Sequence, residues 1–438
     1  MSKLFYQTRL ERPELDRAEG IYMWDKSGKR YIDGSSGAMV SNIGHSNPAV
    51  LHAMQKQMQK STFGYRLHFQ CDVAEQLAEM TAALCPEGLD RVFFVSGGSE
   101  AVESSIKLAR QFALANGNSR KYKIISRTPS YHGSTFGALA LTGYTPMTSA
   151  FEPMMRSMPK IMAPRAYLDG YDPNDENTGL LYARLLEDCI LKNGPETVLA
   201  FIVEPIGGAS TGALVPPKGY MSEIRRICDE YDVLLIHDEV MTGAGRTGTF
   251  LGADHWGIKP DILALSKGFG CGYVPLGAIV ARDDIVDSVL DNGGFVHGYT
   301  YSANPLACAT GVAVLNEIEQ KRLSSNAARQ GNYLIDKLHG LMRKHHLIGD
   351  VRGKGLLTAF ELMSDRKSKT PIPAAKNAYT RLVNIAYENG LIIYSRRTRD
   401  GTEGDHFLVC PPLIVTHEQI DEMVELLDMS IMEFTATL

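Results

Sequence analysis

Paired cysteines and long apolar runs are both missing from this sequence of 438 residues. No run reaches the roughly 18 apolar residues of a membrane span, and residues 1–9 lack the apolar stretch of a signal peptide. Single, widely spaced thiols predict neither a disulfide framework nor a metal site. We therefore expect a cytoplasmic protein with reduced cysteines and no membrane partner. The seven cysteines are Cys71, Cys85, Cys189, Cys228, Cys271, Cys308 and Cys410.

An excess of positive charge is also absent, because the formal net charge is -5. Nucleic-acid binding normally requires a basic face, so we expect no nucleic-acid partner. Apolar residues at 44% and charged residues at 22% are close to globular averages and exclude a disordered or fibrous chain. Because one domain takes roughly 100 to 200 residues, the length predicts two structural parts.

The middle of the chain alternates short β-branched runs with helical patterns, which predicts an α/β fold with a mostly parallel sheet. One helical segment places Ile224, Ile227, Cys228 and Tyr231 on a single apolar face that would pack on this sheet. The predicted strands are residues 92–95, 123–126, 198–203, 233–237, 262–265 and 277–280.

After about residue 303 the pattern changes to longer helices and fewer strands, which predicts a smaller α+β part. The predicted helices are residues 303–319, 327–345, 375–388 and 417–432, and the predicted strands are residues 356–362, 391–394 and 407–409. Near the N-terminus, residues 20–22 and 30–32 flank a turn and predict a hairpin that joins this part or a partner subunit. We expect an N-terminal segment of the small domain at 1–60, a large domain at 61–310, and the rest of the small domain at 311–438.

Asp238 directly follows a predicted strand. Ligands of a doubly wound sheet bind at the carboxyl ends of its strands, so this carboxylate is expected in a ligand crevice. Taken alone, an acidic residue at a strand end is more often a helix cap.

Lys267 ends the next predicted strand, so both side chains reach the same crevice. Pyridoxal 5'-phosphate (PLP) chemistry needs this pair. A lysine amine forms a Schiff base and later moves the proton, and an anion keeps the ring nitrogen protonated. An isolated lysine would more often lie on the surface.

Residues 95–101 read VSGGSEA between a strand and a helix, a pattern typical of a phosphate site at a helix N-terminus. A plain tight turn is the alternative. Neither the Lys-Ser/Thr ending of a P-loop nor a GxGxxG spacing is present, which favours a small phosphate ester over a nucleotide.

Together these segments resemble the class III (ω-) aminotransferases of fold type I, over nearly the whole chain. The resemblance includes Tyr131-His132-Gly133, Glu204-Pro205 and the run from Asp238 to Gly248. It continues through Lys267-Gly268, residues 273–278 and 297–301, and Val351-Arg352-Gly353.

The resemblance implies a PLP enzyme with a large, mostly parallel domain and a smaller α+β domain formed by the N- and C-terminal segments. It implies that Gly98 and Ser99 hold the phosphate, that Tyr131 and Val240 cover the two ring faces, and that Asp238 pairs with the ring nitrogen. It also implies that Lys267 carries the cofactor, and that Tyr299 and Thr300 reach the phosphate of a partner subunit in a homodimer with shared sites.

Other roles are less specific. Tyr131 and His132 could be ordinary core residues, and Glu204 could simply end a strand, whereas in the family it lies near the substrate and the ring oxygen. Met39, Tyr65 and Arg66 are substrate candidates by family position only.

The resemblance also implies a movable arginine near the C-terminal strand that binds the acceptor carboxylate, which a guanidinium matches with two hydrogen bonds. Residues 394–406 are charged and glycine-containing and predict a mobile loop, in which Arg397 is the first candidate beside Arg396 and Arg399. A solvated basic turn without a site role is the alternative. Gly207-Gly208-Ala209 replaces the Gln-Gly-Glu of ornithine- and GABA-type relatives, which disfavours an ornithine-type switch.

We therefore expect transfer of an amino group from an amine or ω-amino acid to a keto acid, pyruvate in the first place. A class III aminomutase and a decarboxylating, dialkylglycine-type PLP enzyme are the alternatives, since motifs around PLP do not separate them. A scaffold that has lost its cofactor is disfavoured, because Lys267 and Asp238 are both present.

Overall fold

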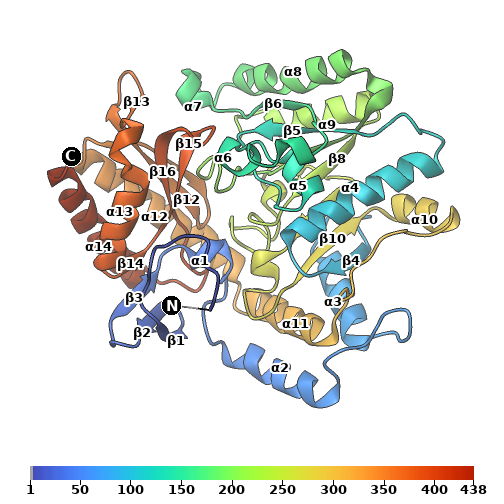
Figure 1. Ribbon diagram of the computed structural model, residues 1–438, viewed down its shortest axis with the longest axis horizontal. Coiled ribbons are helices and arrows are strands. Elements are labelled where there is room, and N and C mark those ends of the chain that lie inside the picture. The colour runs from blue at the N-terminus through green and yellow to red at the C-terminus, as the bar shows by residue number, and fades with distance from the viewer. Residues whose placement is uncertain (1–2) are drawn as a thin grey trace.

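The structure, a computed structural model, describes residues 3–438 and contains three β-sheets. Figure 1 shows a large part at the right and a smaller part at the left that holds both chain ends. Because the first strands and the last helix pack in the same part, the smaller part is assembled from both ends of the chain.

The large part is built on a seven-stranded sheet in the order β4-β10-β9-β8-β7-β5-β6. Its strands run parallel except β10, which is antiparallel to both neighbours. The predicted α/β fold is confirmed, and each of the six predicted runs forms a strand; only the short edge strand β6 was not predicted. The strands are β4 Arg91–Val95, β5 Lys123–Thr128, β6 Lys160–Met162, β7 Val198–Val203, β8 Leu234–Asp238, β9 Ile262–Leu265 and β10 Gly277–Ala281.

Helices cover both faces of this sheet, which is why β7 is buried along its whole length. Ile202 packs into a cluster with α4 and α10, whereas Phe201 packs with α8 and α9 in a second cluster. The predicted apolar face of α9 is buried at Ile224, Ile227 and Cys228. The helices of this part are α2 Pro48–Lys60, α3 Asp72–Ala83, α4 Gly98–Ala115, α5 Phe136–Leu141, α6 Thr145–Thr148, α7 Ala166–Asp169, α8 Glu176–Asn193, α9 Tyr220–Glu230, α10 Asp283–Asp291 and α11 Pro305–Gln320.

The smaller part contains the other two sheets. Strands β1, β2 and β3 continue into β14, so the predicted N-terminal hairpin is confirmed and joins the C-terminal segment. The second sheet has the order β11-β12-β16-β15, and β13 pairs with β12. The strands are β1 Leu15–Glu19, β2 Tyr22–Asp25, β3 Arg30–Asp33, β11 Ile348–Lys354, β12 Leu357–Asp365, β13 Thr370–Pro371, β14 Leu391–Ile392, β15 Tyr394–Arg399 and β16 Glu403–Val409.

Three long helices pack with these sheets, close to the predicted positions. They are α12 Leu323–Lys344, α13 Ala378–Glu388 and α14 His417–Ala436, and the short α1 covers Ser36–Met39. Thr416 begins α14 with a capping box: its side chain accepts a hydrogen bond from the Gln419 backbone N–H, and the Gln419 side chain accepts one from the Thr416 backbone N–H.

The prediction of a mobile loop at residues 394–406 is wrong. Strands β15 and β16 form an antiparallel hairpin there, closed by a turn at residues 400–402. Successive residues of a strand point to opposite faces, so neighbouring charged side chains lie on different faces of the hairpin. Arg397 pairs in register with Asp405, which carries the opposite charge. The charged segment thus forms an ordered hairpin, with β15 as the edge strand of its sheet.

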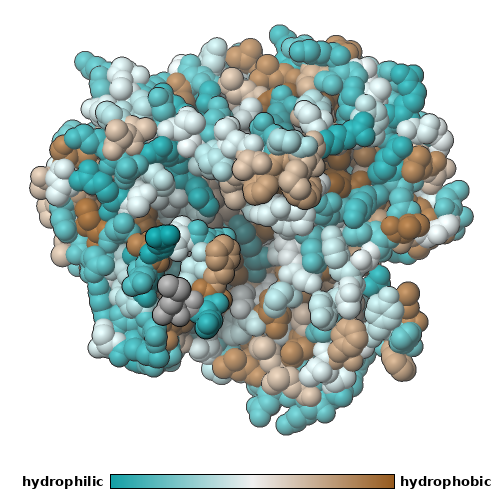
Figure 2. Space-filling view, in the orientation of Figure 1, coloured by the Kyte–Doolittle hydropathy of each residue, from teal (hydrophilic) through white to brown (hydrophobic). Residues whose placement is uncertain are grey.

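Within residues 3–438, no helix is both long and apolar enough to cross a membrane. Figure 2 shows hydrophobic residues in small separate groups among hydrophilic ones on the face that it draws. All seven cysteines are unpaired.

Candidate active site

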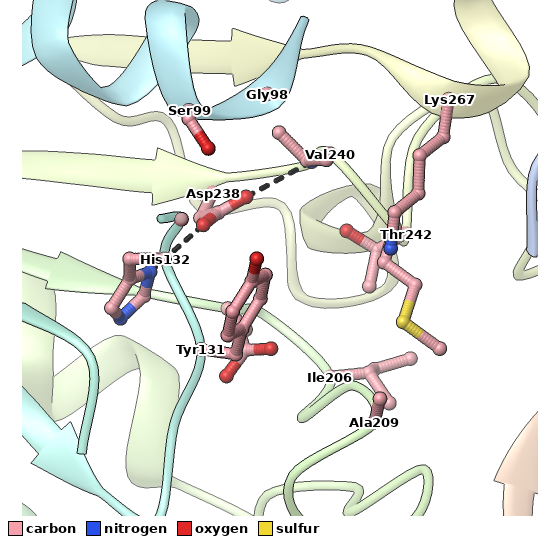
Figure 3. A pocket seen from close by; sticks show the side chains of 13 residues that line it. Gly98, Ser99, Tyr131, His132, Ile206, Ala209, Asp238, Val240, Thr242 and Lys267 are labelled. Carbon is pink, nitrogen blue, oxygen red and sulfur yellow. Dashed lines mark hydrogen bonds and ion pairs between the residues drawn. The ribbon is translucent and has the colours of Figure 1, made fainter. Parts of the chain in front are cut away.

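Lys267 lies just after strand β9, at the start of the short 3-10 turn Lys267–Phe269. Its φ of 49° is in the left-handed region, which residues other than glycine rarely adopt and which is concentrated at functional sites. The side chain extends into a cavity (Figure 3). Among the described residues, its Nζ atom has no hydrogen bond or ion pair, and burial lowers the pKa of the amine. A larger share of the amine is therefore uncharged and nucleophilic near neutral pH.

Asp238 ends the neighbouring strand β8 and is paired in parallel register with Ala264. Its carboxylate is almost fully buried, and Oδ1 accepts a hydrogen bond from the Val240 N–H at 3.1 Å. Oδ2 lies 2.8 Å from His132 Nδ1. Because an ionised carboxylate only accepts, we assign the proton of that bond to His132 Nδ1. The two bonds hold the carboxylate against the cavity.

The first turn of α4 provides the third element. Gly98 and Ser99 open this 18-residue helix, whose free N–H groups and dipole favour an anion. A Cβ at Gly98 would lie 2.8 Å from Val240 Cγ1, so the close approach of the two segments requires glycine there. Ser99 Oγ accepts a hydrogen bond from the Ser134 N–H at 3.0 Å, which leaves its own hydroxyl proton free to donate.

These elements surround a single cavity of about 160 Å³. In Figure 3, Gly98 and Ser99 lie at one end, and Ile206 and Ala209 lie at the other. The residues that line it are Gly98, Ser99, Tyr131, His132, Gly133, Glu204, Ile206, Ala209, Asp238, Val240, Met241, Thr242 and Lys267. Eight of the predicted site residues are therefore brought together: Gly98, Ser99, Tyr131, His132, Glu204, Asp238, Val240 and Lys267.

Glu204 adds a second carboxyl group to this cavity. Its Oε1 accepts a hydrogen bond from the Gly208 N–H at 3.0 Å, but Oε2 is buried without a partner among the described residues. Burial raises the pKa of Glu204. An orphaned carboxyl oxygen and an unpaired amine in one cavity are polar groups that need a ligand.

Five lining residues were not predicted: Gly133, Ile206, Ala209, Met241 and Thr242. Each is within five residues of a predicted one, so proximity in sequence was the available signal. Which residues next to a predicted site residue face the cavity depends on the conformation of the loop. Helix and strand periodicity in the sequence does not describe that conformation.

Six of the predicted residues do not line the cavity. Arg66 donates from Nη1 to the Tyr299 carbonyl oxygen at 3.0 Å, and Tyr65 precedes it. The segment that holds Tyr299 and the exposed Thr300 packs on α4, where His297 Nε2 lies 2.9 Å from Ser104 Oγ. Within one chain, these residues do not contact the cavity.

Met39 and Arg397 are also outside it. Met39 packs beside the cavity with Ile206 and Met241. Arg397, the first candidate for the acceptor carboxylate, donates to the carbonyl oxygens of Ala374 and Thr402 and stacks on Tyr379. Its guanidinium is therefore bound on the α13 side of the hairpin, away from the cavity, and the prediction for this residue is not supported by its position.

Comparison with known proteins agrees with the geometry. The family model described as "Aminotransferase class-III" matches residues 7–431. The chain belongs to the class III aminotransferase family. As members of that family are PLP-dependent, this aminotransferase uses PLP, and both the predicted family and the predicted cofactor are confirmed.

Individual relatives of this aminotransferase cover nearly the whole chain. It is 33% identical to the putrescine–pyruvate aminotransferase of Pseudomonas aeruginosa, over 94% of this chain and 89% of the relative. An (S)-enantioselective omega-transaminase from Thermomicrobium roseum is 34% identical with a TM-score of 0.92, covering 99% and 96% of the two chains. An amine transaminase from an uncultivated Pseudomonas species, solved in its PLP-bound form, is 32% identical with a TM-score of 0.91, covering 99% of each chain.

The residues of the cavity suit this cofactor. The N-terminus of α4 matches the phosphate, Asp238 matches a protonated ring nitrogen, and Lys267 supplies the amine that PLP chemistry requires. When bound, PLP withdraws electrons from the bond that breaks at the substrate carbon.

Proposed function

We propose that this aminotransferase moves an amino group from an amine or ω-amino acid to a keto acid, with pyruvate as the acceptor. The observation that carries the proposal is one cavity that joins an unpaired amine, a buried carboxylate and a helix N-terminus. The names of two relatives support it, since one is a putrescine–pyruvate aminotransferase and another an omega-transaminase.

In this proposal Lys267 has two tasks. Its uncharged amine would hold the cofactor covalently before the substrate binds, and the freed amine would then take and return the proton of the substrate carbon. The absence of a bonding partner among the described residues and the lowered pKa both suit this work.

The other lining residues hold the cofactor. Asp238 keeps the ring nitrogen protonated, and His132 fixes Asp238 through the bond to Oδ2. Gly98 and Ser99 bind the phosphate. Tyr131, Val240 and Glu204 line the same cavity. The first two would cover the ring, and Glu204 would bind near its oxygen.

Arg396, and not Arg397, is our candidate for the acceptor carboxylate. It lies opposite His406 in the hairpin register, and its guanidinium is 5.2 Å from the centre of the Tyr394 ring. Tyr394 packs against the cluster of Ile206 and Met241 beside the cavity, so this face of β15 is the one toward the site. The Arg396 guanidinium has no hydrogen bond or ion pair with any of residues 3–438, so its charge is available to an anion.

We also propose that the enzyme is a homodimer with shared sites, in the cytoplasm. Thr300 is exposed, and the surface around it carries apolar side chains that are unusual on a monomer. Leu67, Val296 and Tyr301 are 73%, 81% and 65% exposed. Tyr299 and Thr300 would then reach the phosphate in the partner.

Visible absorption with a panel of amines, followed by pyruvate, tests the function. The purified enzyme should be yellow, a suitable amine should bleach it, and pyruvate should restore the colour while alanine forms. Equal amounts of free keto product and alanine indicate an aminotransferase. Formation of an isomeric amine without free keto product, or release of carbon dioxide, would instead favour an aminomutase or a decarboxylating enzyme.

A further inference from the structure

A closed loop at residues 207–214 forms the wall of the cavity opposite the phosphate end. Gly207 and Leu214 exchange backbone hydrogen bonds of 2.8 and 3.1 Å and close its neck. Ile206 and Ala209 line the cavity at this wall (Figure 3). The position of Ala209 therefore sets the room for a substrate.

The outer side of the loop is bonded to the smaller part of the molecule. His406 on β16 is fully buried, and its Nε2 lies 2.8 Å from the Ala209 carbonyl oxygen. Arg352 on β11 donates from Nε to the Gly212 carbonyl oxygen at 2.6 Å and from Nη2 to that of Thr211 at 3.0 Å. Three carbonyl groups of one short loop are thus bound by two side chains.

The tautomer of His406 follows from its two partners. The Ala209 carbonyl oxygen can only accept, so the proton must be on Nε2. Nδ1 then accepts from the Thr398 hydroxyl, at 3.0 Å. Burial lowers the pKa of His406 to about 3, so the ring stays neutral and keeps this arrangement at neutral pH.

Arg352 is fixed in the same way. Its guanidinium also pairs with Asp350 at 2.5 Å and with Glu361 at 2.9 Å. At Gly212, where φ is 65°, a Cβ would lie 2.6 Å from the His406 ring, so loop and ring are in direct contact. The loop cannot move outward without breaking these bonds.

We infer that His406 is a positioning residue for substrate specificity, which holds Ala209 in place and so limits the size of the amino donor. The inference rests on the proposed function and deepens it. His406 also lies opposite Arg396 in the hairpin, so the wall for the donor and the candidate arginine for the acceptor share one support.

The test compares His406→Gln with His406→Leu. The glutamine amide can reach the place of Nε2 and donate to the Ala209 carbonyl oxygen, whereas leucine fills the volume and donates nothing. For each variant, kcat/KM is measured with a small donor, propylamine, and a bulky donor, 1-phenylethylamine. PLP affinity is measured in parallel.

In His406→Leu we expect kcat/KM for the bulky donor, divided by kcat/KM for the small donor, to rise about threefold to tenfold. This range corresponds to the free energy of one neutral hydrogen bond. His406→Gln should stay within about twofold of the wild type on the same scale. PLP affinity should not change, because the phosphate is bound at the other end of the cavity. If kcat/KM falls equally for both donors, or if PLP binds more weakly, His406 is an ordinary core residue and the inference is overturned.

Thr398→Val serves if His406→Leu does not fold. It keeps the ring but removes the donor to Nδ1, so the ring can turn its proton away from Ala209, and a smaller shift in the same direction is expected. Amide hydrogen exchange of residues 207–214 should rise in Thr398→Val and His406→Leu but not in His406→Gln. This readout needs no substrate: if the wild type consumes no amine, the proposed function fails, whereas unchanged exchange in both variants contradicts the positioning role by itself.

Discussion

Replacing Asp238 with asparagine removes the negative charge that we propose lies at the cofactor's ring nitrogen. The volume of the side chain hardly changes. Asp238 is 5% exposed, so solvent screens its charge only weakly. A carboxylate next to a basic group shifts the pKa of that group by about 1 to 3 units, and burial favours the upper part of this range. Each unit changes the protonated fraction about tenfold, so we expect the first half-reaction to slow by roughly 100- to 1000-fold.

The hydrogen bonds around Asp238 predict a secondary cost. Both present bonds reach carboxylate oxygens, one from the Val240 N–H and one from His132 Nδ1. Asparagine has only one acceptor oxygen, so His132 must move its proton to Nε2 and accept from the new amide. His132 Nε2 is buried without a partner among the described residues, and such a shift costs about 1 to 3 kcal/mol if it leaves a donor unpaired.

The assay is single-turnover bleaching of the cofactor by a saturating amine, with PLP content and thermal stability measured on the same preparation. We expect PLP to remain bound, because the phosphate site is separate, while the rate falls. His132→Phe is the matched control, since it keeps the carboxylate but removes its hydrogen-bond partner, and it should lose much less. A half-reaction of Asp238→Asn within a few fold of the wild type would refute the role of Asp238.

Further variants test the remaining roles. Lys267→Ala should lose the imine absorbance and turnover, and activity in this variant without an added amine would contradict the assignment. Arg396→Leu should raise KM for pyruvate about 10- to 100-fold and spare the amine half-reaction, whereas Arg399→Leu should change neither; an unaltered KM in Arg396→Leu means that the carboxylate binds elsewhere. Thr300→Ala should weaken PLP binding about tenfold or more, and mixing a Thr300→Ala subunit with Lys267→Ala should restore activity if sites are shared; verified hybrid dimers that stay inactive would argue for sites within one chain. Burial lowers the pKa of His237 to about 3, so the folded protein binds fewer protons than the unfolded chain below about pH 6.5. The free energy of unfolding should therefore fall as the pH drops below 6.5. In urea unfolding, the decrease between pH 6.5 and 5 should be roughly 2 kcal/mol smaller for His237→Leu than for the wild type. If the free energy of unfolding changes equally with pH in the two proteins, His237 contributes nothing to the pH dependence.

Local sequence patterns are enough to place the large sheet and the centre of the cavity. Asp238 and Lys267 follow apolar runs that form neighbouring parallel strands, and the ends of such strands meet at one edge. The glycine pair before α4 marks the helix N-terminus in the same local way. In each case a residue's place next to a strand or helix is enough to position it.

The remaining features depend on how distant segments pack together. Alternation along β15 requires Arg396 and Arg397 to point to opposite faces, but which face meets the cavity depends on how the hairpin packs against the large part. The bond from His406 to Ala209 joins residues 197 positions apart in the sequence, and no periodicity encodes such a contact. Local patterns specify strand ends because backbone geometry is local, whereas the identity of a wall or a charge partner depends on packing between distant segments.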